Sequence, residues 1–184
     1  MLNVIAFYKK AKNIVIEEGF KNEFKNYQNL QLQKITPKEF FDEYVHVVLN
    51  SGMKYQVAEI IKERAYREGF QTIGHTGKRK AIMKMEKKDS AKKCLKKLKN
   101  LDTIDEKLDY LESLPYIGTI TKYHLAKNLG IDIAKPDRHL VRLAKKFDYD
   151  DVQEFCEHIS KKTGDKVTVI DVILWRYSNL FGSK

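Results

Sequence analysis

The chain has 184 residues, of which 42% are hydrophobic and 33% charged, and its formal net charge is +10. This composition is typical of a folded globular chain of one domain or two small lobes, and it excludes an intrinsically disordered one. No apolar run approaches the roughly 20 residues of a membrane-spanning helix. Two cysteines, Cys94 and Cys156, are too few for a disulfide framework or a four-thiolate cluster. We therefore expect an intracellular, cytoplasmic protein without a membrane partner.

The positive charge is concentrated in one short stretch. Residues 71–100 contain eleven Lys or Arg against two acidic residues. A basic excess of this size favours polyanionic partners, because neutralised phosphates release counterions. The candidate contacts are the lysines of one predicted helix, Lys92, Lys93, Lys96 and Lys97. A merely solvated helix face is the alternative, and charge alone does not distinguish DNA, RNA and anionic lipid.

Helical periodicity extends over nearly the whole chain, so the predicted fold class is all-α. Thr36-Pro37-Lys38-Glu39 is a helix start, with an N-cap threonine, a proline at the first helical position and a glutamate to complete a capping box. The glycine-containing stretch 70–80 is predicted to be a loop. Residues 167–170 could alternatively form a strand, but the sequence that follows them favours a helix. The predicted helices, in chain order, are 4–15, 36–49, 55–67, 91–98, 103–114, 120–129, one beginning at 137, 150–162 and 167–180.

The most informative segment is 111–130, where the turn Pro115-Tyr116-Ile117-Gly118 joins two short helices. Gly118 is expected to adopt a backbone conformation closed to other residues and to open the second helix. Amides exposed at a helix N-terminus can bind an anion such as phosphate. Taken alone, this pattern is also that of an ordinary helix turn.

A second segment follows, in which Asp137-Arg138-His139 comes after Pro136 and leads to Arg142. Asp137 is predicted to be the N-cap of the next helix, because Pro136 cannot continue one. The hairpin, the 19 residues from Gly118 to Asp137 and the Asp-x-His-x-x-Arg pattern together resemble the helix-hairpin-helix DNA glycosylases of the endonuclease III-like type. The detailed resemblance covers about residues 111–144, and a looser one extends back to residue 36.

The resemblance implies a two-lobed all-α bundle with a DNA-binding cleft between the lobes. The central lobe would be residues 36–135, with the helix-hairpin-helix at 108–130. The second lobe would combine residues 1–35 with 136–184. The implied partner is double-stranded DNA that contains a damaged or mispaired base, bound by a monomer that needs no cofactor and no metal.

The resemblance also implies roles for individual residues. Asp137 would be the catalytic carboxylate, because N-glycosidic cleavage builds positive charge on the sugar that a fixed carboxylate stabilises. Its alternative is a helix cap only, and both roles are compatible. The implied DNA-binding residues are those of the hairpin and two that follow Asp137, namely Tyr116, Ile117, Gly118, Thr119, His139 and Arg142. For His139 a core position, and for Arg142 a pair with an acidic neighbour, stay open.

Two departures from the family pattern bear on the chemistry. Tyr116 stands where the usual hairpin has its first glycine. Ile120 stands where bifunctional members carry the lysine that forms a Schiff base, and Lys122 should face away on the helix. Monofunctional base hydrolysis is therefore predicted, with Lys135 as the candidate for a displaced nucleophile. The cysteine-rich iron–sulfur loop of many relatives is absent from the sequence.

Three further residues are candidates for contacts with the flipped nucleotide. Asn50 or Met53, at a predicted helix break, would correspond to the residue that fills the gap left by the flipped base. Trp175, followed closely by Tyr177, would contribute to the base pocket. A plain helix connection and a core aromatic pair are the respective alternatives. For the whole chain, the alternatives are a non-catalytic nucleic-acid-binding helix-hairpin-helix protein and a structural helical protein.

Overall fold

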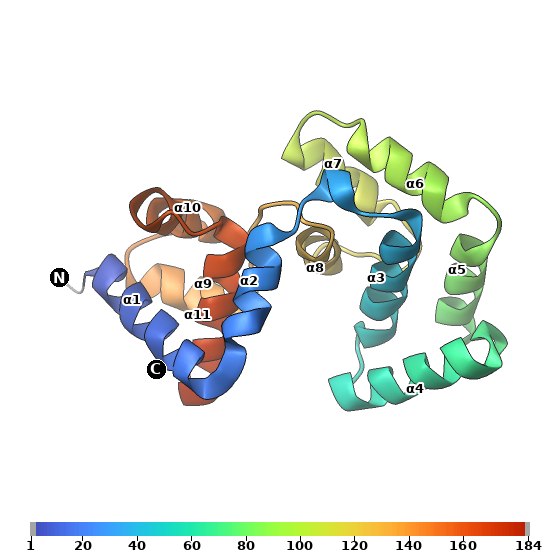
Figure 1. Cartoon of the computed structure of the whole chain (residues 1–184), viewed down its shortest axis with the longest axis horizontal. Helices are drawn as coiled ribbons and strands as arrows, with labels where there is room; N and C mark the ends of the chain where they lie inside the picture. The colour runs from blue at the N-terminus through green and yellow to red at the C-terminus, as the bar shows by residue number, and fades with distance from the viewer. Residues whose placement is uncertain (1–2, 183–184) are drawn as a thin grey trace. The chain divides into compact units, whose positions relative to one another are not determined.

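The computed structural model describes residues 3–182, and every regular element in that range is helical (Figure 1). The all-α prediction is confirmed. None of the helices in the described range is long and apolar enough to cross a membrane. The chain separates into two compact units. We call residues 31–129 the central unit, and residues 1–30 together with 130–184 the terminal unit.

The terminal unit is formed from both ends of the chain. Its helices are α1 (Val4–Val15), α2 (Lys21–Asn29), α9 (Arg138–Lys146), α10 (Val152–Thr163) and α11 (Val167–Phe181). A π-helical turn, η1 (Ile16–Phe20), separates α1 from α2, and within it Gly19 has a φ of 94°. This conformation is costly for residues with a side chain, so Gly19 allows the chain to turn here.

Helix α11 is the centre of the terminal unit, with α1, α2, α9 and α10 packed around it (Figure 1). Residues 167–174 are all buried, which agrees with the rule that a helix surrounded on every side is apolar all round. Thr168 and Asp171 are the polar exceptions in this run. The strand alternative for residues 167–170 is therefore wrong.

The central unit packs its helices around α3. They are α3 (Pro37–Asn50), α4 (Tyr55–Glu68), α5 (Thr76–Glu86), α6 (Ser90–Lys99), α7 (Ile104–Glu112) and α8 (Thr121–Asn128). Helix α3 contacts α4, α5, α6 and α8, and its buried side chains include Phe40 and Tyr44. The predicted capping box is present, since Thr36 accepts from the N–H of Glu39 and the Glu39 carboxylate accepts from the N–H of Thr36.

Two sequence predictions differ from the structure. The stretch 70–80 was expected to be a loop, but α5 begins at Thr76 because the His75 ring accepts the N–H of Lys78 and caps the helix. The units meet in sequence at Leu30/Gln31 and at Leu129/Gly130, rather than at 36 and 135.

Candidate functional site

The hairpin turn lies between α7 and α8, and Tyr116 is its unusual residue. Tyr116 has a φ of 63°, the left-handed conformation that glycine adopts most readily. Gly118 does not have a positive φ, and a Cβ there would be 4.0 Å from Thr121 Oγ1. The expectation that Gly118 occupies a conformation closed to other residues is therefore wrong. The tyrosine itself adopts the glycine-like conformation of the turn.

The structure distinguishes occupied hairpin amides from available ones. The N–H of Gly118 donates to Thr121 Oγ1 over 2.7 Å, and the N–H of Ile117 is bonded within the turn. Within the described residues, the N–H groups of Thr119, Ile120 and Thr121 have no hydrogen-bond acceptor. They lie immediately before and at the first residue of α8, where the helix dipole favours an anion. Of the hairpin residues that the resemblance implied as DNA-binding, Ile117 and Gly118 therefore have occupied amides, whereas the amide of Thr119 is available.

These amides border a hollow in the surface of the central unit. Its volume is about 390 Å³, and it is lined by Ser51 and by residues 116–121. A buried tyrosine of α3, Tyr44, donates its hydroxyl hydrogen to the carbonyl of Pro115 over 2.7 Å and so ties the turn to the core. The hollow is open to solvent and has backbone donors on one side, as an anion site requires.

Asp137 is the N-cap of α9, as predicted. Its Oδ1 accepts from the N–H groups of His139 (2.9 Å) and Leu140 (3.1 Å). Among the described residues, Oδ2 has no hydrogen-bond donor. The side chain is partly exposed. The cap thus orients the carboxylate and leaves one oxygen available to a ligand.

Side chains of the terminal unit hold the loop that leads to Asp137. Residues 131–136 are not helical and make no helical backbone bonds. Three consecutive N–H groups donate instead to side chains of α10 and α11, Ile133 to Thr168 (3.1 Å), Ala134 to Gln153 (2.9 Å) and Lys135 to Asp171. Asp132 in turn accepts the N–H of Thr168 at the start of α11. The position of Asp137 therefore depends on residues more than a helix away in sequence.

Thr168 and Asp171 are functional candidates that the sequence reasoning missed. They are 3% and 1% exposed, and three residues apart they share one side of α11. Buried polar groups are nearly always hydrogen-bonded, so two polar residues in an apolar helix imply a partner segment. That signal was present in the sequence, but the identity of the partner was not.

The structure does not present Lys122 or Lys135 as an evident substitute for the Schiff-base lysine that is missing at position 120. Ile120 is 47% exposed at the position where bifunctional relatives carry lysine. Lys122 Nζ lies 2.5 Å from Glu112 Oε2, and this hydrogen bond raises the pKa of Lys122. A Schiff-base lysine needs the opposite, a lowered pKa that supplies free amine. The backbone N–H of Lys135 donates to the Asp171 carboxylate, so this lysine lies in the loop that leads to Asp137 and not in the hairpin.

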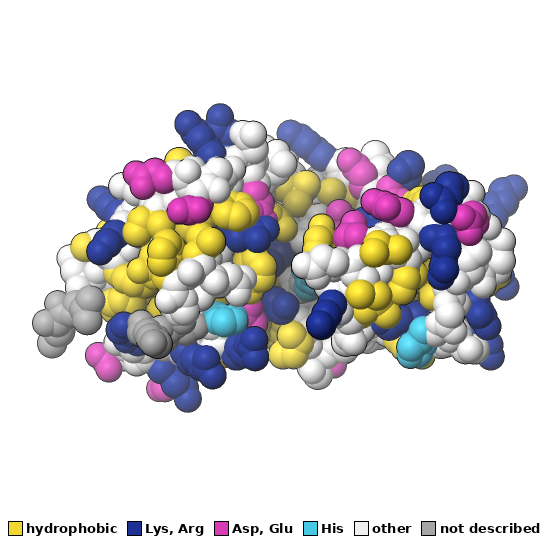
Figure 2. Space-filling view, turned by 90° about the horizontal axis from the view of Figure 1, so that it is seen from below, with side chains coloured by type: hydrophobic (Ala, Val, Ile, Leu, Met, Phe, Trp, Pro, Cys, Tyr) yellow, Lys and Arg dark blue, Asp and Glu magenta, His cyan; other side chains and the backbone are white. Residues whose placement is uncertain are grey.

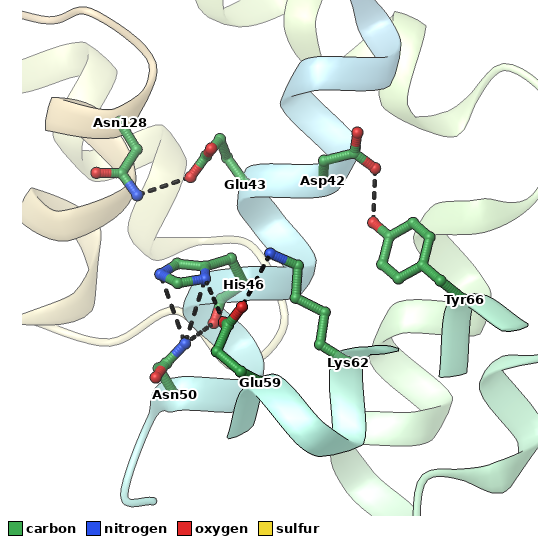
Figure 3. Close-up of polar contacts among 8 residues, drawn as sticks. All are labelled: Asp42, Glu43, His46, Asn50, Glu59, Lys62, Tyr66 and Asn128. Carbon is green, nitrogen blue, oxygen red and sulfur yellow. Dashed lines mark hydrogen bonds and ion pairs between the residues drawn. The ribbon is translucent and has the colours of Figure 1, made fainter. Parts of the chain in front are cut away.

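The helix break at residues 50–53 is braced by a polar network along α3 (Figure 3). The Asn50 amide donates to the carbonyl of His46 over 2.9 Å, and the His46 ring lies 3.2 Å from Glu59 on α4. Asn50 is therefore folded back on its own helix. Met53, also partly exposed, lies beyond the break and bonds through its N–H to the carbonyl of Asn50.

His139 and Arg142 lie in α9, directly after Asp137. His139 is partly exposed, with its ring Nε2 3.4 Å from Arg138 Nε. Arg142 is exposed and forms no ion pair with any residue in the described range. The acidic-neighbour alternative for Arg142 is therefore wrong, and its guanidinium is available to a phosphate.

The basic stretch has more than one role. Lys92, Lys93, Lys96 and Lys97 are all exposed on α6, and the ammonium of Lys97 also lies 4.6 Å from the ring centroid of Tyr110. Lys99 donates to the carbonyls of residues 33 and 35. Lysines and arginines also lie on the surfaces of both units, with acidic side chains among them (Figure 2). The positive surface is therefore not confined to α6.

The aromatic pair near the C-terminus packs mainly against the core. Trp175 is half-buried against the terminal unit's apolar core, with the Arg176 guanidinium 4.8 Å from its ring centroid. Tyr177 meets Phe7 edge to face, with ring centroids 5.4 Å apart. Cys94 and Cys156 do not form a disulfide. Within residues 3–182 there is no group of three or more His, Cys, Asp or Glu placed to hold a metal ion.

Comparison with solved structures identifies the fold. The protein is similar to the 8-oxoguanine glycosylase/lyase of Methanocaldococcus jannaschii in complex with 15mer DNA containing 8-oxoguanine, with a TM-score of 0.68 at 17% identity over 98% of this chain and 97% of that one. It is similar to the 8-oxoguanine DNA glycosylase of Thermotoga maritima, with a TM-score of 0.68 at 18% identity over 98% of each chain. A second M. jannaschii structure of this glycosylase gives 0.67 at 17%, over 96% of this chain and 94% of that one.

No family model matches the sequence, and no curated protein is similar to it. The structural likeness covers nearly the whole chain at low identity, so what it establishes is the fold. The chain has the all-helical fold of the 8-oxoguanine DNA glycosylases. The fold that the hairpin and Asp137 pattern implied is therefore confirmed.

Proposed function

We propose that the protein is a DNA glycosylase of base excision repair that removes a damaged or mispaired base by hydrolysis. The observation that carries this proposal is Asp137. Asp137 caps α9 through its Oδ1 and leaves its Oδ2 available to a ligand. It follows a hairpin that has available amides, and the chain has the fold of DNA glycosylases. A non-catalytic helix-hairpin-helix module has no need of such a carboxylate.

In the binding step, the hairpin and Arg142 contact the DNA backbone. The amides of Thr119, Ile120 and Thr121 would bind one phosphate, and Arg142 another. Such contacts orient the duplex without reading its sequence. The target nucleotide has to leave the base stack, since its glycosidic bond is inaccessible inside a duplex.

In the chemical step, the carboxylate of Asp137 acts on the sugar of the target nucleotide. The bond from C1′ to the base nitrogen breaks, and its electron pair leaves with the base. Asp137 stabilises the positive charge that develops on the sugar. A water oxygen then bonds to C1′, and the proton it loses passes to the Asp137 carboxylate and from there to the departed base, which leaves Asp137 ionised again. The products are a free base and an intact abasic strand.

We further propose that the enzyme is monofunctional. A lyase needs an amine at C1′, and Ile120 has none. The pKa of Lys122 is raised by Glu112, which disfavours it as a substitute. The M. jannaschii protein is named a glycosylase/lyase, so this chain would differ from it in chemistry while sharing its fold.

The test is a panel of duplexes, each with a single lesion. The names of the similar structures make 8-oxoguanine the first to try, followed by alkylated purines, deaminated bases and mismatches. Released base is measured by chromatography, and strand breaks with and without alkali. We expect one lesion to yield free base with breaks only after alkali. Binding to duplexes without release of any base would favour the non-catalytic alternative.

A further inference from the structure

The first turn of α5 contacts the hairpin turn, which the proposed function directs at DNA, and the helix break at 50–53, where the sequence placed candidates for the residue that fills the gap left by a flipped base. We infer that Gly77 and Lys78 are positioning residues, which hold the hairpin turn at 115–118 and the helix break at 50–53 in fixed places. This inference rests on the proposed glycosylase function and assigns a purpose to a segment that the sequence predicted as a loop.

Gly77 leaves room for the end of the Tyr116 side chain, which packs against it although the tyrosine is 44% exposed. A Cβ at position 77 would lie 1.5 Å from the Tyr116 hydroxyl oxygen and 2.5 Å from Cζ. The tyrosine ring therefore fills the space that any side chain at 77 would need. It also meets the His75 ring edge to face, with centroids 5.8 Å apart. This packing offsets the cost of a left-handed backbone at Tyr116, where most hairpins of this kind use glycine.

Lys78 holds the helix break through its ammonium group. The side chain is buried, and Nζ donates to the carbonyls of Leu49 (2.9 Å) and Ser51 (2.6 Å). These are carbonyls at the C-terminal end of α3, which have no helical partner and carry the negative end of the helix dipole. Burial lowers the pKa of Lys78, and the two carbonyls compensate the cost of burying its charge.

The two contacts meet at the hollow beside the hairpin. Ser51 lines this hollow together with Tyr116 and the amides that would bind phosphate. One helical turn thus determines where the phosphate site lies relative to the turn that carries Met53. If either segment shifted, the two could no longer contact the same DNA strand at the same time.

Gly77→Ala tests the hairpin contact, and Gly74→Ala is its matched control. Gly74 has a conformation open to other residues and nothing within 4 Å of its Cβ position. We expect Gly77→Ala to weaken binding to a duplex with a tetrahydrofuran abasic analogue by about tenfold, since displacements near 1 Å have large effects. It should also shift the amide NMR resonances of residues 119–121. Gly74→Ala should match the wild type in both measurements.

Tyr116→Gly supplies the double-mutant cycle. With the ring gone, Gly77→Ala should cause no further loss of affinity and no further amide shift. Equal behaviour of the two alanine variants, or a Gly77→Ala effect that persists beside Tyr116→Gly, would overturn the positioning role of Gly77. Shifted amides together with a wild type that binds no duplex would instead contradict the proposed function and support the contact itself.

Lys78→Met tests the contact to the helix break, with exposed Lys80→Met as the control. The readout is fluorescence of 2-aminopurine placed next to the abasic analogue, which rises when the base unstacks. We expect Lys78→Met to lower the rise at saturating protein at least twofold, and Lys80→Met to leave it unchanged. Equal fluorescence for Lys78→Met, Lys80→Met and wild type would overturn the role of Lys78.

Discussion

Thr168→Val should destabilise the terminal unit through the loop that leads to Asp137. Thr168 Oγ1 accepts the N–H of Ile133 over 3.1 Å, and its single hydrogen can bond one of two nearby carbonyls, at 3.2 and 3.3 Å. Valine keeps the shape and removes both bonds. Ile133 is 4% exposed, so water does not replace the acceptor.

The expected loss follows from the orphaned donor. A buried N–H without an acceptor costs about 1–3 kcal/mol of unfolding free energy. For a chain of this length each kcal/mol lowers Tm by roughly 2–4 °C. Urea unfolding followed by the fluorescence of Trp175, the single tryptophan, reports on this unit directly. Thr119→Val makes the same change at an exposed position and is the control. An unfolding free energy for Thr168→Val within about 0.5 kcal/mol of wild type, as for a surface substitution, would refute the argument.

Three further variants probe the hairpin and the charge. Ile120→Lys should gain a borohydride-trappable complex that the wild type lacks, because the exposed position accepts lysine; trapping by the wild type would contradict the monofunctional proposal. Gly118→Ala should leave Tm unchanged, since its Cβ meets nothing closer than 4.0 Å, and a lower Tm would show that the turn needs glycine. Reversing Lys92, Lys93 and Lys96 to Glu should weaken duplex binding and make the slope of log affinity against log salt shallower, and an unchanged slope would exclude α6 from the DNA contact.

The sequence predicted the features that depend on neighbouring residues. The capping box at Thr36 and the N-cap at Asp137 are local hydrogen bonds between residues two or three apart, and both are present. The order of hairpin and carboxylate also led to the correct fold. The short helix α2 was not predicted, because Gly19 interrupts the periodicity before it.

The features that were missed depend on contacts between distant residues. Thr168 is 35 residues from Ile133, whose N–H it accepts, and no local pattern pairs them. The packing of Tyr116 on Gly77 likewise joins α5 to the hairpin across the central unit. Glycines in the stretch 70–80 suggested a loop, whereas one of them makes room for the tyrosine inside a helix.

The most direct test of the account is base release by Asp137→Asn. Asparagine is as good an N-cap as aspartate, so the variant should keep its stability and bind a lesion duplex within a few fold of the wild type. It lacks the negative charge that stabilises the sugar in the transition state, so single-turnover base release should fall by at least about 100-fold. A variant that folds, binds and releases base at the wild-type rate would mean that Asp137 only caps α9, and the proposed mechanism would be wrong.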